Sequence, residues 1–173
     1  MRALSLVEAL KIIEGTFAAA KAHNCHALAA IVLDAGGRIK AFQKQDGASL
    51  MRFEIAYGKA FAALSLGRSS RMVLQKAKEK PLFVQSLERI ADGPLFLEAG
   101  GQLIRDGQGE IVGAIGVTGD INEMDDICAT TGISSAGFRA DDHFSEKDQR
   151  RLNIKKNPTL KDLRRKQRST RKK

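Results

Sequence analysis

The sequence has no tryptophan, one tyrosine and eight phenylalanines among its 173 residues. Since 43% of the residues are still hydrophobic, the core must consist mainly of aliphatic side chains and alanine. No apolar run approaches the roughly 18–20 residues that a membrane-spanning helix requires. The first ten residues contain Arg2 and Glu8 and no continuous apolar stretch, so the sequence indicates no signal peptide. We therefore expect a cytoplasmic protein.

Several motifs that identify enzymes and cofactor sites are also missing. Two cysteines, Cys25 and Cys128, are too few for a disulfide-rich scaffold or a four-cysteine metal site. Neither G-x-S-x-G nor H-E-x-x-H occurs. The glycines at 113, 116 and 119 have neither the Rossmann nor the P-loop spacing, so we interpret them as strand glycines that allow close backbone approach. No set of catalytic residues is evident.

The net charge of +9 is concentrated at one end of the chain. Residues 145–173 contain 13 basic and three acidic residues, whereas residues 1–144 contain 16 basic and 17 acidic residues. We therefore predict a nearly neutral domain over residues 1–144 and a basic, disordered tail over residues 145–173. This tail is either a solvated extension or a contact for nucleic acid and other polyanions. The candidate polyanion-binding residues are Arg164, Arg165, Lys166, Arg168 and Arg171.

Hydrophobic periodicity and capping signals predict a helix, a β-hairpin, a group of helices, a second hairpin and a last helix. This order favours an α+β fold, in which helices pack on an antiparallel sheet. The predicted helices cover about residues 5–23, 49–66, 69–80, 83–90 and 122–132, and the predicted strands cover residues 27–33, 38–42, 102–105 and 110–117.

Local patterns refine these predictions. Ser5 and Glu8 form a capping box, and Ser49 is the predicted cap of the second helix. That helix carries alanines spaced for one face, which would let another element approach closely. The alanines are Ala56, Ala60 and Ala63, and the predicted apolar stripe of the first helix consists of Leu6, Leu10, Ile13, Phe17 and Ala20.

Four carboxylates surround the start of the last helix. They complement the helix dipole and would repel a phosphate group there. They could instead hold Mg²⁺ or Ca²⁺, although the spacing of an EF-hand fails at Met124. The four residues are Asp120, Glu123, Asp125 and Asp126.

Two histidines and one lysine are further candidates for a site. His23 and His26 would share a face of a continuous helix, as a pair of metal or haem ligands does, but the helix is predicted to end between them. The alternative is a polar junction between helix and strand. Lys59 either faces a pocket or extends along the surface with its charge in solvent, and we favour the surface position.

The order of these motifs resembles the haem-degrading or haem-binding domain family. This family includes glycolate-operon accessory proteins, bacterial haem-binding sensor proteins and the C-terminal domain of propanediol-utilisation corrinoid adenosyltransferases. The resemblance spans about Leu4 to Gly137. It rests on residues 29–37 (AAIVLDAGG), 46–48 (DGA), 100–101 (GG) and 113–119 (GAIGVTG), on the helix with Ala56, Lys59 and Ala60, and on the helix with Asp125, Cys128 and Gly132.

The resemblance implies a profilin-like sandwich with about five antiparallel strands, assembled into a homo-oligomer. It also implies binding of a tetrapyrrole, either haem or cobalamin. A threonine associated with haem binding in the sensor branch corresponds to Thr118, and the nearest match to a histidine iron ligand is His23. His26 and Lys59 complete the candidate cofactor-binding residues. The basic tail has no counterpart in the family pattern.

The resemblance favours a tetrapyrrole-binding protein with an accessory or sensor role. One alternative is a small-molecule enzyme or accessory protein of glycolate- or diol-type catabolism. A second alternative is a protein that contacts nucleic acid through its basic tail. The resemblance extends only to the C-terminal domain of the propanediol enzymes, so it does not imply adenosyltransferase activity.

Overall fold

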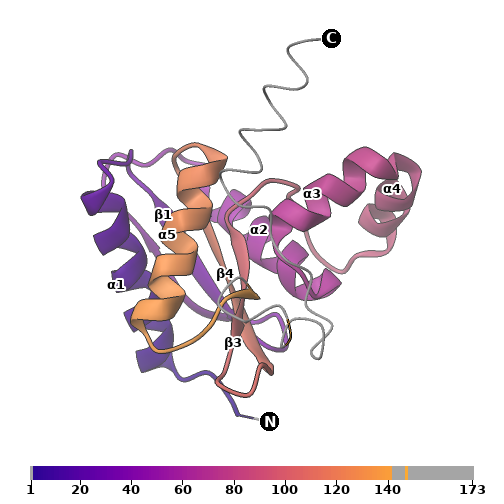
Figure 1. The fold of residues 1–173 in the computed structure, drawn as a ribbon. Helices are drawn as coiled ribbons and strands as arrows, with labels where there is room; N and C mark the ends of the chain where they lie inside the picture. The colour runs from indigo at the N-terminus through magenta and orange to yellow at the C-terminus, as the bar shows by residue number, and fades with distance from the viewer. Residues whose placement is uncertain (1, 142–146, 148–173) are drawn as a thin grey trace.

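The computed structural model describes residues 2–141 and Lys147, and Figure 1 shows the ribbon. The predicted order of helices and hairpins is confirmed. The elements are α1 (Leu6–Ala22), β1 (Ala29–Asp34), β2 (Ile39–Lys44), α2 (Arg52–Leu66), α3 (Ser70–Glu79), α4 (Pro81–Ile90), β3 (Gly101–Arg105), β4 (Ile111–Thr118) and α5 (Asn122–Ser135).

The four strands form one antiparallel sheet in the order β2-β1-β4-β3. The expected count of about five strands was therefore one too high for the described residues. Each predicted hairpin contributes two strands, and the segment after α5 adds only an isolated bridge between Arg105 and Arg139. The α+β class is confirmed.

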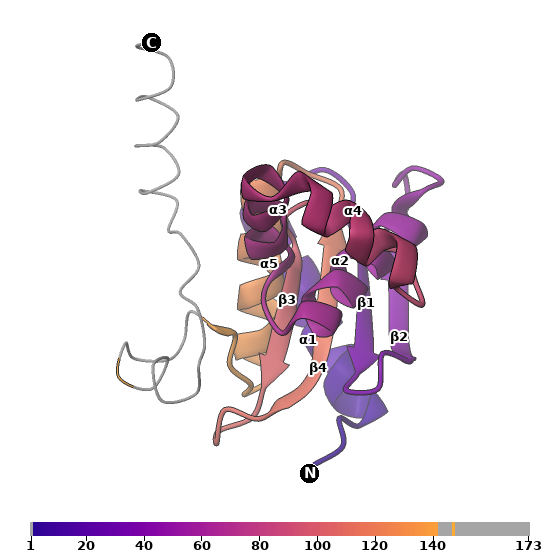
Figure 2. The ribbon, with the colours of Figure 1, turned by 90° about the vertical axis from the view of Figure 1, so that its right-hand side faces the viewer.

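Helices cover both faces of this sheet (Figures 1 and 2). Helices α1 and α5 pack on one face, and α2 packs on the other. Because side chains of a strand alternate between faces, Ala30 and Val32 of β1 join the α1/α5 core while Ile31 and Leu33 join the α2 core. The strand predicted over residues 27–33 is found two residues later at its start and one later at its end, as β1, and is buried on both faces as predicted.

Helix α2 lies unusually close to β4. A Cβ atom added at Gly116 would lie 1.9 Å from the carbonyl oxygen of Ala56. Ala56, Ala60 and Ala63 are fully buried at this contact. Both the predicted small-residue face of the helix and the predicted role of the strand glycine are confirmed.

The predicted apolar stripe of α1 is partly wrong. Leu6 and Leu10 are exposed, at 53% and 40%. Helix α5 crosses close to α1, where Gly132 lies against Thr16, so the contact face requires small side chains and the leucines lie at its edge. The buried residues of α1 are Ala9, Ile12, Ile13, Thr16, Ala19 and Ala20.

Local sequence decides two of the three helix ends for which a capping residue was predicted. Ser5 and Glu8 make the predicted capping box of α1. Gly67 ends α2 in the left-handed conformation, with φ 62°. Ser49 does not cap α2, because the chain makes a further turn before the helix begins; Met51 occupies the cap position and offers no polar side chain.

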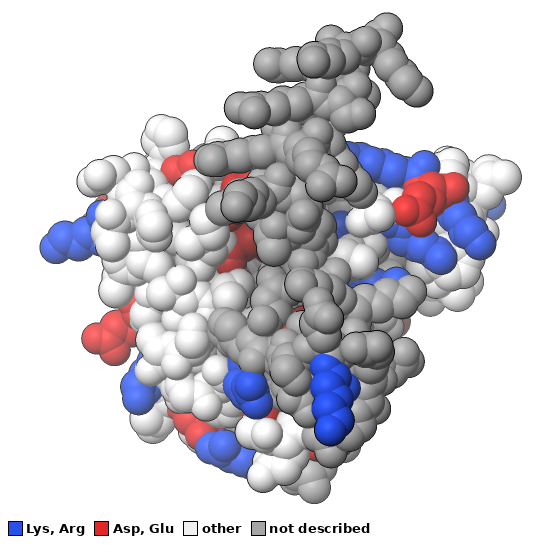
Figure 3. Space-filling model, viewed as in Figure 1, with Lys and Arg blue, Asp and Glu red and all other residues white. Residues whose placement is uncertain are grey.

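Helices α3 and α4 form a hairpin that projects beside α2 (Figure 1). Lys and Arg side chains gather on it (Figure 3), since residues 68–90 include six basic and two acidic residues. Leu82, Phe83 and Ile90 of α4 are exposed. Among the described residues, no helix combines the length and the apolar character that crossing a bilayer would need.

Candidate functional site

The structure brings three of the predicted site residues to one end of the sheet. Thr118 is the last residue of β4 and is buried. Lys59 lies on α2, and His26 lies just before β1. His23 is the exposed C-cap of α1. The predicted polyanion-binding residues at 164–171 lie outside the described part of the chain.

Thr118 is held by an arginine that the sequence analysis missed. The Nη1 atom of Arg52 donates a hydrogen bond of 2.9 Å to the Thr118 hydroxyl oxygen. The Nε atom of Arg52 is also buried and, in the part of the chain that the structure describes, has no hydrogen-bond partner. One weak signal was present in the sequence: a cation in the first turn of a helix is unfavourable against the helix dipole, and a hydrogen-bond partner offsets this cost.

Lys59 is not on the surface. Its side chain is 3% exposed, and Nζ donates to the Val117 carbonyl at 3.1 Å and to Asp125 Oδ2 at 2.8 Å. The prediction of a surface lysine was wrong, because Lys59 follows Ala56 by three residues and shares its buried face. Burial raises the pKa of the Asp125 carboxyl, against the opposing effect of the Lys59 ammonium group.

Asp120 links this pair to His26. Its Oδ2 atom accepts the His26 backbone amide at 2.7 Å and lies 3.1 Å from His26 Nδ1. The backbone amide of Asp120 donates in turn to Asp125 Oδ1 at 3.1 Å. Hydrogen bonds, above all the one from the His26 amide, lower the pKa of the Asp120 carboxyl. The loop before α5 is therefore fastened to the segment before β1.

A second carboxylate of α5 also points inward. Asp126 pairs with Arg71 of α3 through Oδ2, and its Oδ1 atom accepts the Gly100 amide at 2.8 Å and Gln102 Nε2 at 3.1 Å. Three of the four acidic residues predicted to complement the helix dipole therefore pair with a cation: Asp125 with buried Lys59, and both Asp126 and, at 3.9 Å, Glu123 with Arg71. Among the described residues, no three side chains of the ligating types are grouped as a metal ion requires.

The two cysteines, one before β1 and one on α5, lie close to each other. Cys25 is half-buried and Cys128 is fully buried, with their sulfur atoms 4.0 Å apart. Burial raises the pKa of both thiols, to about 12 for Cys128, and the carboxylates of Asp120 and Asp125 act in the same direction. Both thiols are therefore protonated at neutral pH.

These raised pKa values predict a loss of stability at alkaline pH. Above the ordinary thiol pKa of 9.0, the unfolded chain binds fewer protons than the folded one, so the free energy of unfolding falls as pH rises. For Cys128 the slope is roughly 1.4 kcal/mol per pH unit. Urea unfolding at a series of pH values should show this slope in the wild type and a flatter one in Cys128→Ala. Equal slopes would contradict the prediction.

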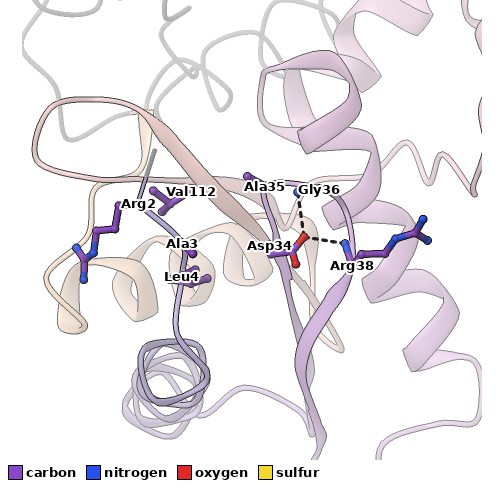
Figure 4. Close-up of a pocket in the computed structure, with 8 residues that line it drawn as sticks. All are labelled: Arg2, Ala3, Leu4, Asp34, Ala35, Gly36, Arg38 and Val112. Atoms are coloured by element: carbon purple, nitrogen blue, oxygen red, sulfur yellow. Dashed lines mark hydrogen bonds between the residues drawn. The ribbon is translucent and has the colours of Figure 1, made fainter.

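A pocket lies at the opposite end of the sheet (Figure 4). Its volume is about 390 Å³. Along β1, Asp34 pairs with Gly113 at the pocket end, and Ala29 pairs with Thr118 five residues away, a separation of roughly 17 Å. The pocket therefore contains none of the predicted site residues. It is lined by Arg2, Ala3, Leu4, Asp34, Ala35, Gly36, Arg38 and Val112.

Comparison with protein-family models matches residues 4–134 to the HbpS-like family, described as haem-degrading proteins. The chain belongs to this family. The matched segment spans all the elements from α1 to nearly the end of α5, and so includes the whole Arg52, Thr118 and His26 region. A comparison with curated proteins found no match.

Solved structures agree with this assignment. HbpS is 28% identical with a TM-score of 0.67, and the match covers 78% of this chain and 90% of HbpS. A double mutant of HbpS from Streptomyces reticuli is 27% identical with a TM-score of 0.67, covering 78% and 87%. A PduOC–haem complex is 21% identical with a TM-score of 0.69, covering 79% and 97%. At that identity the last likeness concerns the fold alone.

Proposed function

We propose that the end of the sheet around Thr118 binds haem, with His26 as an iron ligand and Arg52 as the partner of a propionate carboxylate. The observation that carries the proposal is the contact between His26 Nδ1 and Asp120. When bound, haem supplies a redox-active iron. The residues of this chain bind and orient it.

His26 has the arrangement expected of a metal-binding histidine. Such histidines commonly donate one ring nitrogen to a carboxylate, which fixes the tautomer and leaves the other nitrogen for the metal. Asp120 Oδ2 lies 3.1 Å from Nδ1, and the His26 side chain is 88% exposed, so Nε2 is accessible. His23, the nearest match to the histidine of relatives, caps α1 in an exposed position, and no contact in the described part of the chain joins it to Asp120.

Arg52 supplies the basic group that a propionate requires. Its Nε is buried and has no hydrogen-bond partner among the described residues, while Arg52 as a whole is half-buried. A small movement of the guanidinium group would let a propionate oxygen reach Nε and form a charge-assisted hydrogen bond. The Thr118 hydroxyl accepts from Nη1 and thereby orients the guanidinium group. In this proposal Thr118 positions Arg52 and is not an iron ligand, since a neutral hydroxyl binds iron weakly.

Exposed apolar side chains adjoin these polar groups. Leu50 and Met51 directly precede Arg52 and are 85% and 55% exposed, and Ile121 directly follows Asp120 and is 62% exposed. Large apolar side chains gathered at a solvent-exposed site commonly indicate a binding surface. They fit the flat apolar faces of a macrocycle.

Family membership and the haem bound to PduOC support this proposal. Cobalamin binding, an accessory or sensor role, assembly into a homo-oligomer and a cytoplasmic location stay predictions. A titration with aquocobalamin beside the haem titration separates the two tetrapyrroles.

Haem titration of the purified full chain tests the proposal. We expect a shifted Soret band that saturates at a fixed stoichiometry. His26→Ala should abolish the shift, and Asp120→Asn should weaken haem affinity by roughly 10-fold or more, because the imidazole loses its orienting carboxylate. Arg52→Gln should weaken it by roughly 10- to 100-fold through the lost charge-assisted hydrogen bond.

Two control variants accompany this titration. Arg38→Gln removes an exposed arginine at the opposite end of the sheet and should leave haem affinity unchanged. His23→Ala should also leave it unchanged. A wild type without saturable binding would refute the proposal, and loss of the Soret shift in His23→Ala alone would transfer the ligand role to His23.

A further inference from the structure

We propose that Cys25 and Cys128 form a reversible intramolecular disulfide, a modification site for oxidants of the low-molecular-weight disulfide class. The two residues are 103 positions apart in sequence, and their sulfur atoms lie 4.0 Å apart. They are the only cysteines of the chain. The inference does not depend on haem binding.

The end of α1 fixes the position of Cys25. The Cys25 amide donates to the Ala20 carbonyl at 2.9 Å and the Asn24 amide to the Lys21 carbonyl at 3.2 Å, while Asn24 adopts a left-handed φ of 52°. This is a Schellman motif, in which the residue after the left-handed one turns back onto the helix. Cys25 therefore packs against the core at a defined place.

The position of Cys128 is fixed by its place in helix α5. It is fully buried in the middle of α5, within the core that α1 and α5 share. A disulfide requires an S–S distance of about 2.05 Å, so the sulfur atoms must approach each other by roughly 2 Å. Side-chain rotation and a small shift of the Cys25 segment can provide this approach without separating the two helices.

The difference in exposure assigns the order of the reaction. Burial raises the pKa of Cys25, so only a small fraction of this thiol is ionised, but it is the more exposed of the two cysteines. This thiolate fraction attacks one sulfur of glutathione disulfide; a Cys25–glutathione S–S bond forms, and one glutathione thiolate leaves and takes up a proton. The Cys128 thiol then attacks the Cys25 sulfur and passes its proton to the departing glutathione thiolate, which leaves as the second glutathione thiol. In total, two protein thiols are oxidised to one disulfide, and glutathione disulfide is reduced to two thiols.

The cross-link would join the segment before β1 to α5 and close a loop that contains all four strands of the sheet. A loop of this length restricts the unfolded chain strongly. We therefore expect the oxidised protein to melt roughly 5–15 °C above the reduced one. A dithiol reductant should return the melting temperature to its starting value.

Intact-mass measurement of the folded full chain after incubation with glutathione disulfide tests the proposal. The mass of the wild type should fall by two hydrogen atoms, and no thiol should react with an alkylating reagent after denaturation. The protein should run as a monomer on a non-reducing gel. Digestion should yield one peptide pair cross-linked between Cys25 and Cys128. A disulfide between chains, or two thiols that stay free, would overturn the proposal.

Two variants separate the steps, with circular dichroism confirming that each is folded. Cys128→Ser should stop at the mixed disulfide and gain the mass of one glutathione moiety on Cys25. Cys25→Ser should gain nothing, because buried Cys128 is not reached. If the wild type also ends as a stable mixed disulfide on Cys25, the two sulfurs do not close in the fold and the inference fails.

Discussion

Gly116→Ala should destabilise the protein by roughly 3–5 kcal/mol, among the largest effects of a single methyl group. The added Cβ would lie 1.9 Å from the carbonyl oxygen of Ala56 and 3.0 Å from the Ala60 amide nitrogen. Both obstacles are backbone atoms, so no side-chain rotation relieves the clash. Helix α2 must then move away from β4, which also loosens the cluster of buried alanines.

Gly107→Ala is the matched control for this prediction. Gly107 lies in the turn between β3 and β4, and an added Cβ there meets no atom within 4 Å. This variant should therefore unfold within about 0.5 kcal/mol of the wild type. Urea titration followed by circular dichroism measures both variants. A small effect at Gly116 would mean that α2 and β4 are not in the close contact described above.

Lys59→Met should cost roughly 3–5 kcal/mol, because it leaves the Asp125 carboxylate buried without its cation. For a domain of this size, the melting temperature should fall by about 10 °C. Lys78→Met, which removes an exposed lysine of α3, is the matched control and should have little effect. Thermal unfolding followed by circular dichroism measures the difference.

The buried pair also predicts a distinct pH dependence. Without Lys59, the folded-state pKa of Asp125 lies still further above its ordinary value of 3.8, since burial then acts without opposition from the ammonium group. A raised folded pKa gives stability that is present below the unfolded value and is lost as pH rises. The cost of Lys59→Met should therefore be small near pH 4 and grow toward pH 7.

A double-mutant cycle completes this test. Lys59→Met combined with Asp125→Asn should cost clearly less than the sum of the two single changes, because no buried charge remains unpaired. Additive effects would show that the two side chains do not interact in the folded protein. The prediction concerns stability alone, since neither side chain is accessible to a ligand.

Elements with local causes could be predicted from the sequence. The capping box at Ser5 and Glu8, the glycine that ends α2 and the two hairpin turns depend on residues within a few positions of each other. The start of α2 was predicted wrongly. Ser49 could cap a helix, but whether it does depends on the direction in which the chain leaves the preceding hairpin. The stripe on α1 was partly wrong because α5, more than 100 residues later, decides which side of α1 is covered.

In the candidate site, contacts between residues far apart in sequence are more important than local patterns. The pattern that placed Lys59 on the face with Ala56 was present in the sequence, but nothing local indicated that Asp125 would lie opposite. Arg52 was missed because its partner, Thr118, is 66 residues away. The proposed role of His26 rests on Asp120, which the sequence analysis assigned to the dipole of α5.

By itself, the sequence determined the order of helices and hairpins, the α+β class and the family resemblance. It also indicated the close backbone contact at Gly116. These features depend on periodicity, turn residues and small side chains, which are read from residues near one another in the sequence. Only the tertiary structure decided which carboxylate meets which cation, which histidine stands beside Asp120, and that two distant cysteines meet. Those pairings depend on how the ends of β1, β4 and α5 converge, and side chains that converge in space leave no periodic signal along the chain.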